Sequence, residues 1–188
     1  MADHKRNYTE ISLYPEQPGS PGPDYDLLAA QLREFAITEP SPIPLLANAS
    51  ALLKEALADV NWAGFYLRRE TDAAEPELLL GPFQGKTACI RIPWGRGVCG
   101  TAAQEDCTQL VPDVHAFPGH IACDSASNAE IVVPIHNKGG YVVGVLDIDS
   151  PLKGRFSETD KVGLEQFVKV LEDYGKWFKI NSDNCFAM

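Results

Sequence analysis

Two apolar runs joined by a short glycine-containing turn constrain the fold of this chain most strongly. The runs extend over residues 130–135 and 141–148, and the segment Asn137-Lys138-Gly139-Gly140 separates them. Runs rich in Val and Ile on either side of such a turn indicate a β-hairpin. We therefore predict an antiparallel pair of strands in this part of the chain.

The second of these strands carries two carboxylates. Because side chains alternate across a strand, Asp147 and Asp149 are predicted to share a face with Val143 and Val145, with Leu146 on the other face. Carboxylates on an apolar face are costly unless they meet a ligand, a metal or hydrogen-bond donors. The alternative interpretation is an ordinary solvated strand end.

An aromatic segment upstream is predicted to form another strand, from Asn61 to Leu67. Alternation puts Trp62, Gly64 and Tyr66 on one face, where the glycine would leave space between two aromatic rings that carry polar groups. That arrangement suggests one wall of a pocket, although two aromatic side chains in an ordinary core would give the same pattern.

Helical spacing of apolar residues and turn-forming residues define the other elements. Ser157 is the candidate N-cap of the last helix. Helices that lie before, between and after antiparallel strands indicate an α+β class, in which helices pack against a central sheet. We expect helices over residues 24–36, 43–57 and 157–178, and further strands over 77–81, 87–92 and 108–111.

A glycine-rich turn, with Gly95, Gly97 and Gly100, is predicted to open into a short helix. Glycines before a helix allow backbone N–H groups to converge on an anion. The spacing matches neither the P-loop nor the dinucleotide-binding pattern, so a nucleotide phosphate is not supported. We expect a small carboxylate as the anion.

The charge of the chain limits its partners. Its 188 residues have a formal net charge of −10, which argues against nucleic-acid or anionic membrane partners, since both need clustered Lys and Arg. No apolar run is long enough to span a membrane, and no hydrophobic segment follows Met1. We expect a cytoplasmic protein that binds small molecules or other proteins.

The five cysteines are an odd number, and none of them form a C-x-x-C pair. This pattern disfavours a zinc ribbon, a thioredoxin-type motif and a fully paired disulfide scaffold, and we expect no metal site. In a reducing compartment, cysteines that form a bridge are usually catalytic or redox-sensing. They are Cys89, Cys99, Cys107, Cys123 and Cys185.

Cys123 has the most reactive setting of the five. It lies among small and polar residues that suit a loop, seven residues before Glu130, the first residue of a predicted strand. A loop cysteine near water and hydrogen-bond donors is deprotonated more readily than a cysteine in an apolar core. Taken alone, Cys123 could also be a small buried hydrophobe.

Six motifs in order resemble the free methionine-(R)-sulfoxide reductases, which are catalytic GAF-domain proteins, and the resemblance covers about residues 43–178. The motifs are Asn61-Trp62-Ala63-Gly64-Phe65-Tyr66, Gly81-Pro82-Phe83-Gln84-Gly85, Ala88-Cys89-Ile90, Gly97-Val98-Cys99-Gly100, His120-Ile121-Ala122-Cys123-Asp124 and Gly144-Val145-Leu146-Asp147-Ile148-Asp149.

The resemblance implies a six-stranded antiparallel sheet with flanking helices and a closed pocket over one face. It also implies that Cys123 is the catalytic cysteine, Cys89 the resolving cysteine and Cys99 an auxiliary one. The proton donor to the sulfoxide oxygen would be Glu130, Asp147 or Asp149, and Glu130 is favoured because it lies just downstream of Cys123, in a pocket that would raise its pKa. The implied substrate-binding residues are Trp62, Tyr66, Glu130, Asp147 and Asp149. Cys107 and Cys185 fall outside the family pattern.

The expected reaction reduces free methionine-(R)-sulfoxide without a cofactor, and a thioredoxin-like protein reopens the resulting disulfide. A homodimer is compatible with the resemblance. Along the chain we expect a Pro-rich arm over residues 1–23, the GAF domain over 24–180 and a tail over 181–188.

Two other functions remain open from the residues. A non-catalytic GAF sensor would bind a small molecule or report oxidation through the same cysteines, because GAF domains mostly bind ligands. A cysteine hydrolase would pair Cys123 with His120, but catalytic Cys and His partners usually come from distant parts of a chain.

Overall fold

The computed structural model describes residues 22–72, 75–119 and 125–177 of the chain. Within them, six strands form one antiparallel sheet in the order β3-β2-β1-β6-β5-β4. The predicted α+β class, six-stranded antiparallel sheet and hairpin are therefore confirmed. The strands are β1 (Trp62–Arg69), β2 (Glu77–Gln84), β3 (Arg91–Pro93), β4 (Gln109–Val111), β5 (Ala129–His136) and β6 (Val142–Ser150).

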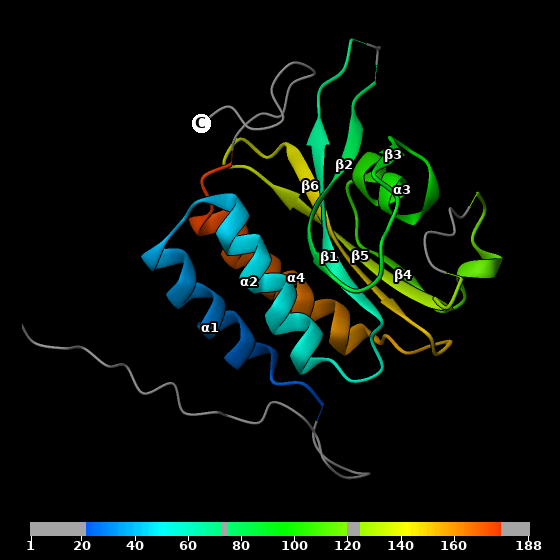
Figure 1. The fold of residues 1–188 in the computed structure, drawn as a ribbon, viewed down its shortest axis with the longest axis horizontal. Helices are drawn as coiled ribbons and strands as arrows, with labels where there is room; N and C mark the ends of the chain where they lie inside the picture. Colours follow the sequence, from blue (N-terminus) through cyan, green and yellow to red (C-terminus); the bar gives the residue numbers. More distant parts are fainter. Residues whose placement is uncertain (1–21, 73–74, 120–124, 178–188) are drawn as a thin grey trace, which may run out of the picture.

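The helices cover the sheet unequally. In Figure 1, α1, α2 and α4 lie together on one side of the strands, and α3 lies on the other side near β3 and β4. Helices α2 and α4 contact the sheet, whereas α1 packs on these two helices. The helices are α1 (Tyr25–Thr38), α2 (Pro42–Ala56), α3 (Gly97–Glu105) and α4 (Glu158–Tyr174), with a short 3-10 turn η1 (Val114–Ala116).

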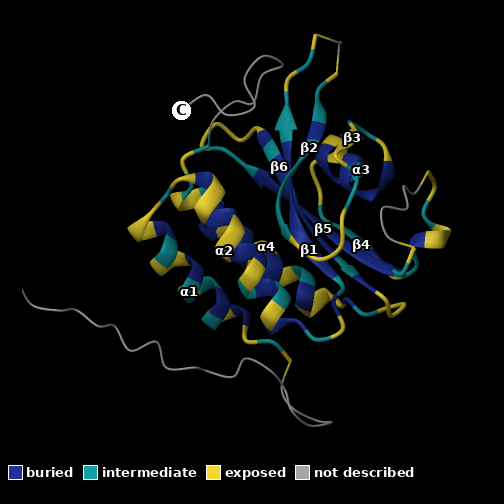
Figure 2. Ribbon diagram, viewed as in Figure 1, coloured by how far each residue is buried: buried dark blue, intermediate teal, exposed yellow. Residues whose placement is uncertain are grey.

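The alternating pattern of β1 divides the interior into two cores. Ala63, Phe65 and Leu67 lie in the large core beneath α1, α2 and α4. Trp62 and Tyr66 lie in the smaller core beneath α3. The central strands are buried along almost their whole length (Figure 2), so both faces of the sheet are covered, and the predicted division of β1 is confirmed.

Strand β2 is longer than predicted, because Gly81-Pro82 does not end it. The pairing with β1 passes from Gly64 opposite Phe83 to Tyr66 opposite Leu80, which leaves a bulge at Gly81 and Pro82. A bulge accommodates a proline, which has no N–H to donate to the ladder. The strand therefore continues to Gln84 and brings Phe83 opposite Gly64.

Three further predictions were wrong in detail. Strand β3 begins only at Arg91, and α4 ends at Tyr174 rather than near residue 178. Val143 packs with the core beneath α4 rather than beside Asp147. The reason is a register shift: Ile135 pairs with Gly144 and His136 with Val142, so Val143 is an extra residue that reverses the alternation.

The start of α4 is fixed as predicted. The Ser157 side chain accepts a hydrogen bond from the Asp160 N–H, and the Asp160 carboxylate accepts one from the Ser157 N–H, which forms a capping box. The buried Tyr25 hydroxyl donates to Asp160 Oδ1 at 2.7 Å. This bond joins the first turn of α1 to the first turn of α4.

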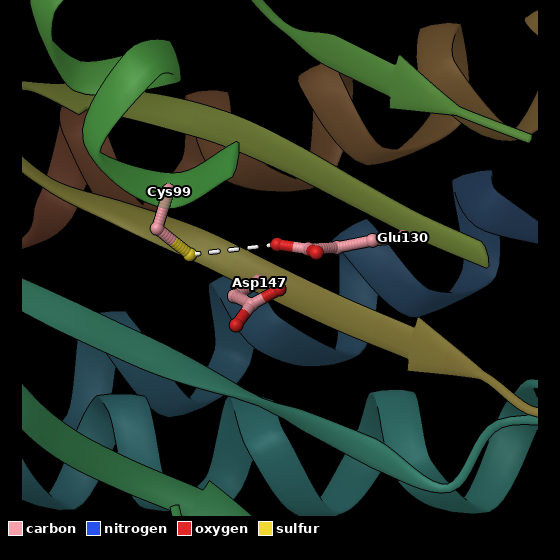
Figure 3. A group of neighbouring side chains, drawn as sticks. All are labelled: Cys99, Glu130 and Asp147. Atoms are coloured by element: carbon pink, nitrogen blue, oxygen red, sulfur yellow. Dashed lines mark hydrogen bonds between the residues drawn. The ribbon is translucent and has the colours of Figure 1, made fainter. Parts of the chain in front are cut away.

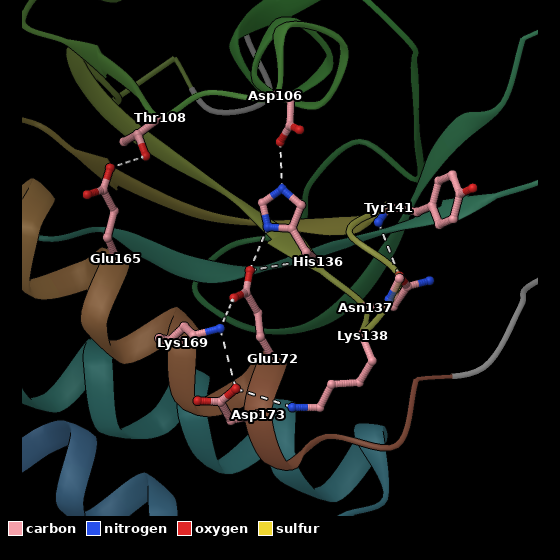
Figure 4. Close-up of polar contacts among 11 residues, drawn as sticks. Asp106, Thr108, His136, Asn137, Lys138, Tyr141, Glu165, Lys169, Glu172 and Asp173 are labelled. Atoms are coloured by element: carbon pink, nitrogen blue, oxygen red, sulfur yellow. Dashed lines mark hydrogen bonds and ion pairs between the residues drawn. The ribbon is translucent and has the colours of Figure 1, made fainter.

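His136 connects three elements at the opposite end of α4 (Figure 4). It ends β5, and its Nδ1 lies 2.6 Å from Glu172 Oε1 on α4. Its Nε2 lies 2.6 Å from Oδ1 of Asp106, the left-handed residue that caps α3. Lys169 and Lys138 complete the network through Glu172 and Asp173. The ring of His136 therefore links the C-terminal end of α3 to α4.

None of the helices in the described ranges has the length and apolar character needed to cross a lipid bilayer.

Candidate active site

The register of the sheet brings the predicted site residues onto one face. Glu130 on β5 lies opposite Asp149 on β6, and Asp149 lies opposite Trp62 on β1. Asp147 lies two residues before Asp149 on β6, opposite Gly64. Because alternate residues of a strand share a face, the carboxylates and Trp62 all face the side covered by α3.

Helix α3 begins in a turn that requires glycine. Gly95 and Gly97 have φ of 72° and 63°, in the left-handed region that side chains with a Cβ rarely adopt. A Cβ on Gly100 would lie 2.5 Å from the Pro93 carbonyl oxygen, so the first turn of α3 packs tightly against the preceding turn. This tight packing holds Cys99 against the sheet.

Cys99, Glu130 and Asp147 converge between α3 and the sheet. Figure 3 shows the three side chains pointing toward one another, from α3, β5 and β6. The Cys99 thiol donates to Glu130 Oε1 with an Sγ–Oε1 distance of 3.7 Å. The exposed fractions are only 4% for Cys99, 7% for Glu130 and 6% for Asp147. We call these three residues the buried triad.

Burial of the triad favours its protonated forms. Removal from water raises the pKa of Glu130 well above its usual value, and the negative charges of Asp147 and Asp149 raise it further. Burial likewise raises the pKa of Asp147, to about 7. The pKa of the Cys99 thiol is raised by burial and by the same carboxylates. The triad can therefore hold and donate a proton near neutral pH, whereas Cys99 is a poor thiolate.

Two aromatic rings line the sheet beside the triad. The rings of Trp62 and Tyr66 stack with centroids 5.9 Å apart. Trp62 Nε1 donates to the Lys86 carbonyl, and the Tyr66 hydroxyl donates to the Cys89 carbonyl at 3.0 Å. These bonds fix the segment that carries Cys89 over the aromatic side chains.

Sequence reasoning missed Phe83 and misjudged Gly64. Phe83 stacks on Trp62 with centroids 5.2 Å apart. A Cβ on Gly64 would lie 2.3 Å from the Cβ of Phe83 and 2.7 Å from the edge of the Trp62 ring. The glycine therefore admits Phe83 and Trp62 rather than leaving open space between Trp62 and Tyr66. The bulge in β2, which puts Phe83 opposite Gly64, gave no clear signal in the sequence.

The glycine-rich turn is less available to an anion than predicted. The Gly95 N–H donates to the Gly100 carbonyl, and the Arg96 N–H donates to the Pro93 carbonyl. These two donors close the turn itself. No described side chain caps the first turn of α3, and the Gly100 N–H donates to the Arg96 carbonyl. The N–H groups of Gly97, Val98 and Cys99 are therefore the ones that could face a carboxylate.

Cys123 and His120 lie outside the described residues, so the predicted nucleophile and the alternative hydrolase pair stay predictions. The chain that follows is firmly held: Ser127 Oγ accepts from Asn61 Nδ2 at 3.0 Å, and the Asn128 N–H donates to the Ser150 carbonyl at 2.7 Å. The described cysteines Cys89, Cys99 and Cys107 are all free thiols.

The triad is also a set of metal-ligating atoms. The Cys99 sulfur and one oxygen from each of Glu130 and Asp147 lie within 4.8 Å of one another. The sequence indicated that Asp147 could meet a metal, but it did not connect Asp147 with Cys99 and Glu130, and no metal site was expected. The members of this group come from three separate elements, and no local spacing could have indicated it.

Comparison with known proteins identifies the family. Residues 41–172 match the GAF domain family. Over 146 residues the chain is 55% identical to the free methionine-R-sulfoxide reductase of Escherichia coli, covering 74% of this chain and 85% of that protein. The chain belongs to the GAF-domain free methionine-R-sulfoxide reductases.

Solved structures agree with membership of the free methionine-R-sulfoxide reductases. The fRMsr of Staphylococcus aureus in complex with substrate is 47% identical, with a TM-score of 0.74, and the match covers 84% of this chain and 99% of that one. The free methionine-R-sulfoxide reductase from Neisseria meningitidis, in complex with its substrate, is 45% identical with a TM-score of 0.73, and the match covers 80% of this chain and 87% of that one.

Proposed function

We propose that this chain reduces free methionine-(R)-sulfoxide to methionine. The observation that carries the proposal is the buried triad, in which burial raises the pKa values of Glu130 and Asp147 beside an aromatic surface of the sheet. A sulfoxide oxygen leaves only when it is protonated, and a buried carboxyl group can supply that proton near neutral pH. Relatives named for this reaction support the proposal.

The first step uses Cys123 as the nucleophile. Its thiolate attacks the sulfoxide sulfur while Glu130 donates a proton to the oxygen. The attack forms a bond between the Cys123 sulfur and the substrate sulfur. As the hydroxyl group passes to Cys123, this bond and the sulfur–oxygen bond of the substrate both break, and methionine leaves. Cys123 is thereby oxidised to a sulfenic acid, and the sulfoxide is reduced by two electrons.

The second step restores the thiols. Cys89 attacks the sulfenic sulfur of Cys123, which forms a disulfide and releases water. A dithiol protein of the thioredoxin type then opens the disulfide by exchange and is itself oxidised. Cys99, which burial keeps protonated, has an auxiliary role as a thiol that donates to Glu130.

Substrate recognition is assigned to the same face of the sheet. Trp62 and Tyr66 present aromatic surface to the S-methyl group and to the partial positive charge on the sulfoxide sulfur. Asp147 and Asp149, which follow each other on one face of β6, suit the ammonium group of a free amino acid. If binding requires both charged termini of the substrate, the enzyme acts only on free methionine sulfoxide.

The partners and location follow from the chemistry. A disulfide that is reopened in every cycle needs a dithiol reductant, and a reducing compartment supplies one. We therefore include a thioredoxin-like partner and a cytoplasmic location in the proposal. The resemblance to GAF domains also allows a homodimer, which stays a prediction. Sedimentation equilibrium, which measures the mass of the protein in solution, tests it.

Substrate discrimination tests this function. The protein is given thioredoxin, its reductase, NADPH and one of three substrates: the free R epimer, the free S epimer, or the R epimer blocked at both termini. We expect NADPH consumption with the free R epimer alone. Comparable turnover of the blocked compound would contradict recognition of the termini, and absence of all turnover would favour a ligand-binding GAF sensor.

A further inference from the structure

The buried triad contains one polar atom whose bonding is incomplete. Oδ1 of Asp147 is buried, and no hydrogen-bond partner for it exists among the described residues. A buried carboxylate oxygen without a donor is costly. One carboxylate oxygen of Asp147 lies within 4.8 Å of the Cys99 sulfur and of a Glu130 oxygen, and the three side chains point toward one another (Figure 3). Oδ1 of Asp147 therefore lacks a positively charged or hydrogen-donating partner among the described residues.

We propose that the triad is a binding site for a thiophilic divalent cation such as Zn²⁺, which occupies it in competition with the sulfoxide. Zinc takes cysteine sulfur at about 2.3 Å and carboxylate oxygen at about 2.0–2.2 Å in a tetrahedron, so its sulfur and oxygen ligands lie roughly 3.5 Å apart. The Cys99 Sγ–Glu130 Oε1 distance is 3.7 Å. Little movement is needed to hold both ligands on one metal.

The ligand set determines which cations bind. Mg²⁺ and Ca²⁺ prefer oxygen ligands, whereas a thiolate favours zinc and related transition metals. The ligands release the protons they hold when the metal binds. The cation also neutralises the buried Asp147 carboxylate, whose Oδ1 has no hydrogen-bond donor among the described residues. Three protein ligands leave one tetrahedral position for water, as in open zinc sites.

The consequence for activity rests on the proposed function. If Glu130 donates the proton and Asp147 contacts the substrate, a metal bound to both blocks them. Zn²⁺ should then act as a reversible inhibitor that methionine-(R)-sulfoxide and chelators relieve. The binding site itself is defined by the triad geometry and can be measured without any substrate.

Cobalt(II) is the probe, because thiolate-bound Co²⁺ has a near-ultraviolet charge-transfer band and tetrahedral Co²⁺ absorbs strongly in the visible. The full-length reduced protein is titrated with Co²⁺. We expect one equivalent to bind with both features, and Zn²⁺ to displace it. Absence of these features at Co²⁺ concentrations up to about 1 mM would overturn the proposal.

Matched cysteine variants identify the ligand. The charge-transfer band should disappear in Cys99→Ser and persist in Cys107→Ser, whose cysteine is exposed outside the triad. A band that persists in Cys99→Ser would overturn the proposal. Asp147→Asn keeps the thiol and should weaken the Kd for Co²⁺ by about tenfold or more, since even indirect support of a metal ligand contributes that much. Unchanged affinity in Asp147→Asn would also contradict the site.

The cobalt titration can fail or succeed independently of the proposed reductase function. Cobalt binding with the expected variant pattern, in a protein that does not reduce methionine-(R)-sulfoxide, would sustain the metal site and refute the proposed function. Turnover without cobalt binding would do the reverse. Circular dichroism of each variant establishes that loss of the band does not come from unfolding.

Discussion

The thiol of Cys99 on α3 donates to Glu130 on β5, with Sγ 3.7 Å from Oε1, so the auxiliary cysteine of the family contacts the favoured proton donor. The contact is buried on both sides. A thiol that stays protonated there orients the carboxyl group without competing with it as a nucleophile. In the proposed function, Cys99 is thus a positioning residue for Glu130.

Replacement of Glu130 by Gln should remove the proton donor while preserving its shape. We expect kcat to fall by about 10²–10⁴-fold, the usual contribution of a general acid, as measured by NADPH consumption with saturating substrate. Glu55→Gln, on the exposed face of α2, is the matched control and should retain full activity. Full turnover in Glu130→Gln together with loss in Asp147→Asn would make Asp147 the acid instead.

The pH dependence of turnover should report the protonated triad. Burial raises the pKa of Asp147 to about 7, so the neighbouring carboxyl groups of Asp147 and Glu130 together lose one proton near this pH. We expect kcat/KM to decline as pH rises above about 7, on the alkaline limb of a bell-shaped profile. Asp147→Asn should shift the pH at which kcat/KM declines. If the decline is unchanged in this variant, it comes from the titration of another group.

Gly100→Ala tests the tight turn before α3. The added Cβ would lie 2.5 Å from the Pro93 carbonyl oxygen. We expect the free energy of unfolding to fall by about 1–3 kcal/mol, as for other overpacked sites, with a loss of activity because Cys99 is the adjacent residue. Gly22→Ala, where a Cβ would meet nothing within 4 Å, should change neither quantity. Equal stability of Gly100→Ala and the unmodified protein in urea would contradict the close approach.

His136 should make the stability of the fold depend on pH. Partial burial lowers its pKa, but hydrogen bonds with Asp106 and Glu172 outweigh burial and raise the pKa above 6.5. The protonated ring therefore stabilises the folded state fully below about pH 6.5, and this contribution is lost as pH rises through the folded pKa. Urea unfolding of His136→Gln across that range should show a smaller decline with pH, and an identical slope would exclude His136 as its source.

Patterns within a few consecutive residues predicted the helices, strands and turns whose formation depends on neighbouring residues. The hairpin around Gly139, the two faces of β1 and the Ser157 N-cap follow from alternation, turn composition and capping chemistry. The resemblance supplied the roles of the site residues, and the sheet register then put Glu130, Asp147 and Trp62 on one face.

Features that depend on tertiary geometry could not be predicted. The bulges at Pro82 and Val143 arise from pairing with a neighbouring strand, and each changes which side chains meet. The contact of Cys99 with Glu130 spans 31 residues and depends on how α3 lies on the sheet. The incomplete bonding of Asp147 Oδ1 is likewise visible only once three elements are assembled.

The most direct test of the account compares the protein with its Cys123→Ser variant in the presence of thioredoxin, its reductase and free methionine-(R)-sulfoxide. The measured quantity is the rate of NADPH consumption. We predict steady turnover by the intact protein and its complete loss in the variant. Turnover that survives in Cys123→Ser, or none in the intact protein with a working reductant, would contradict the account.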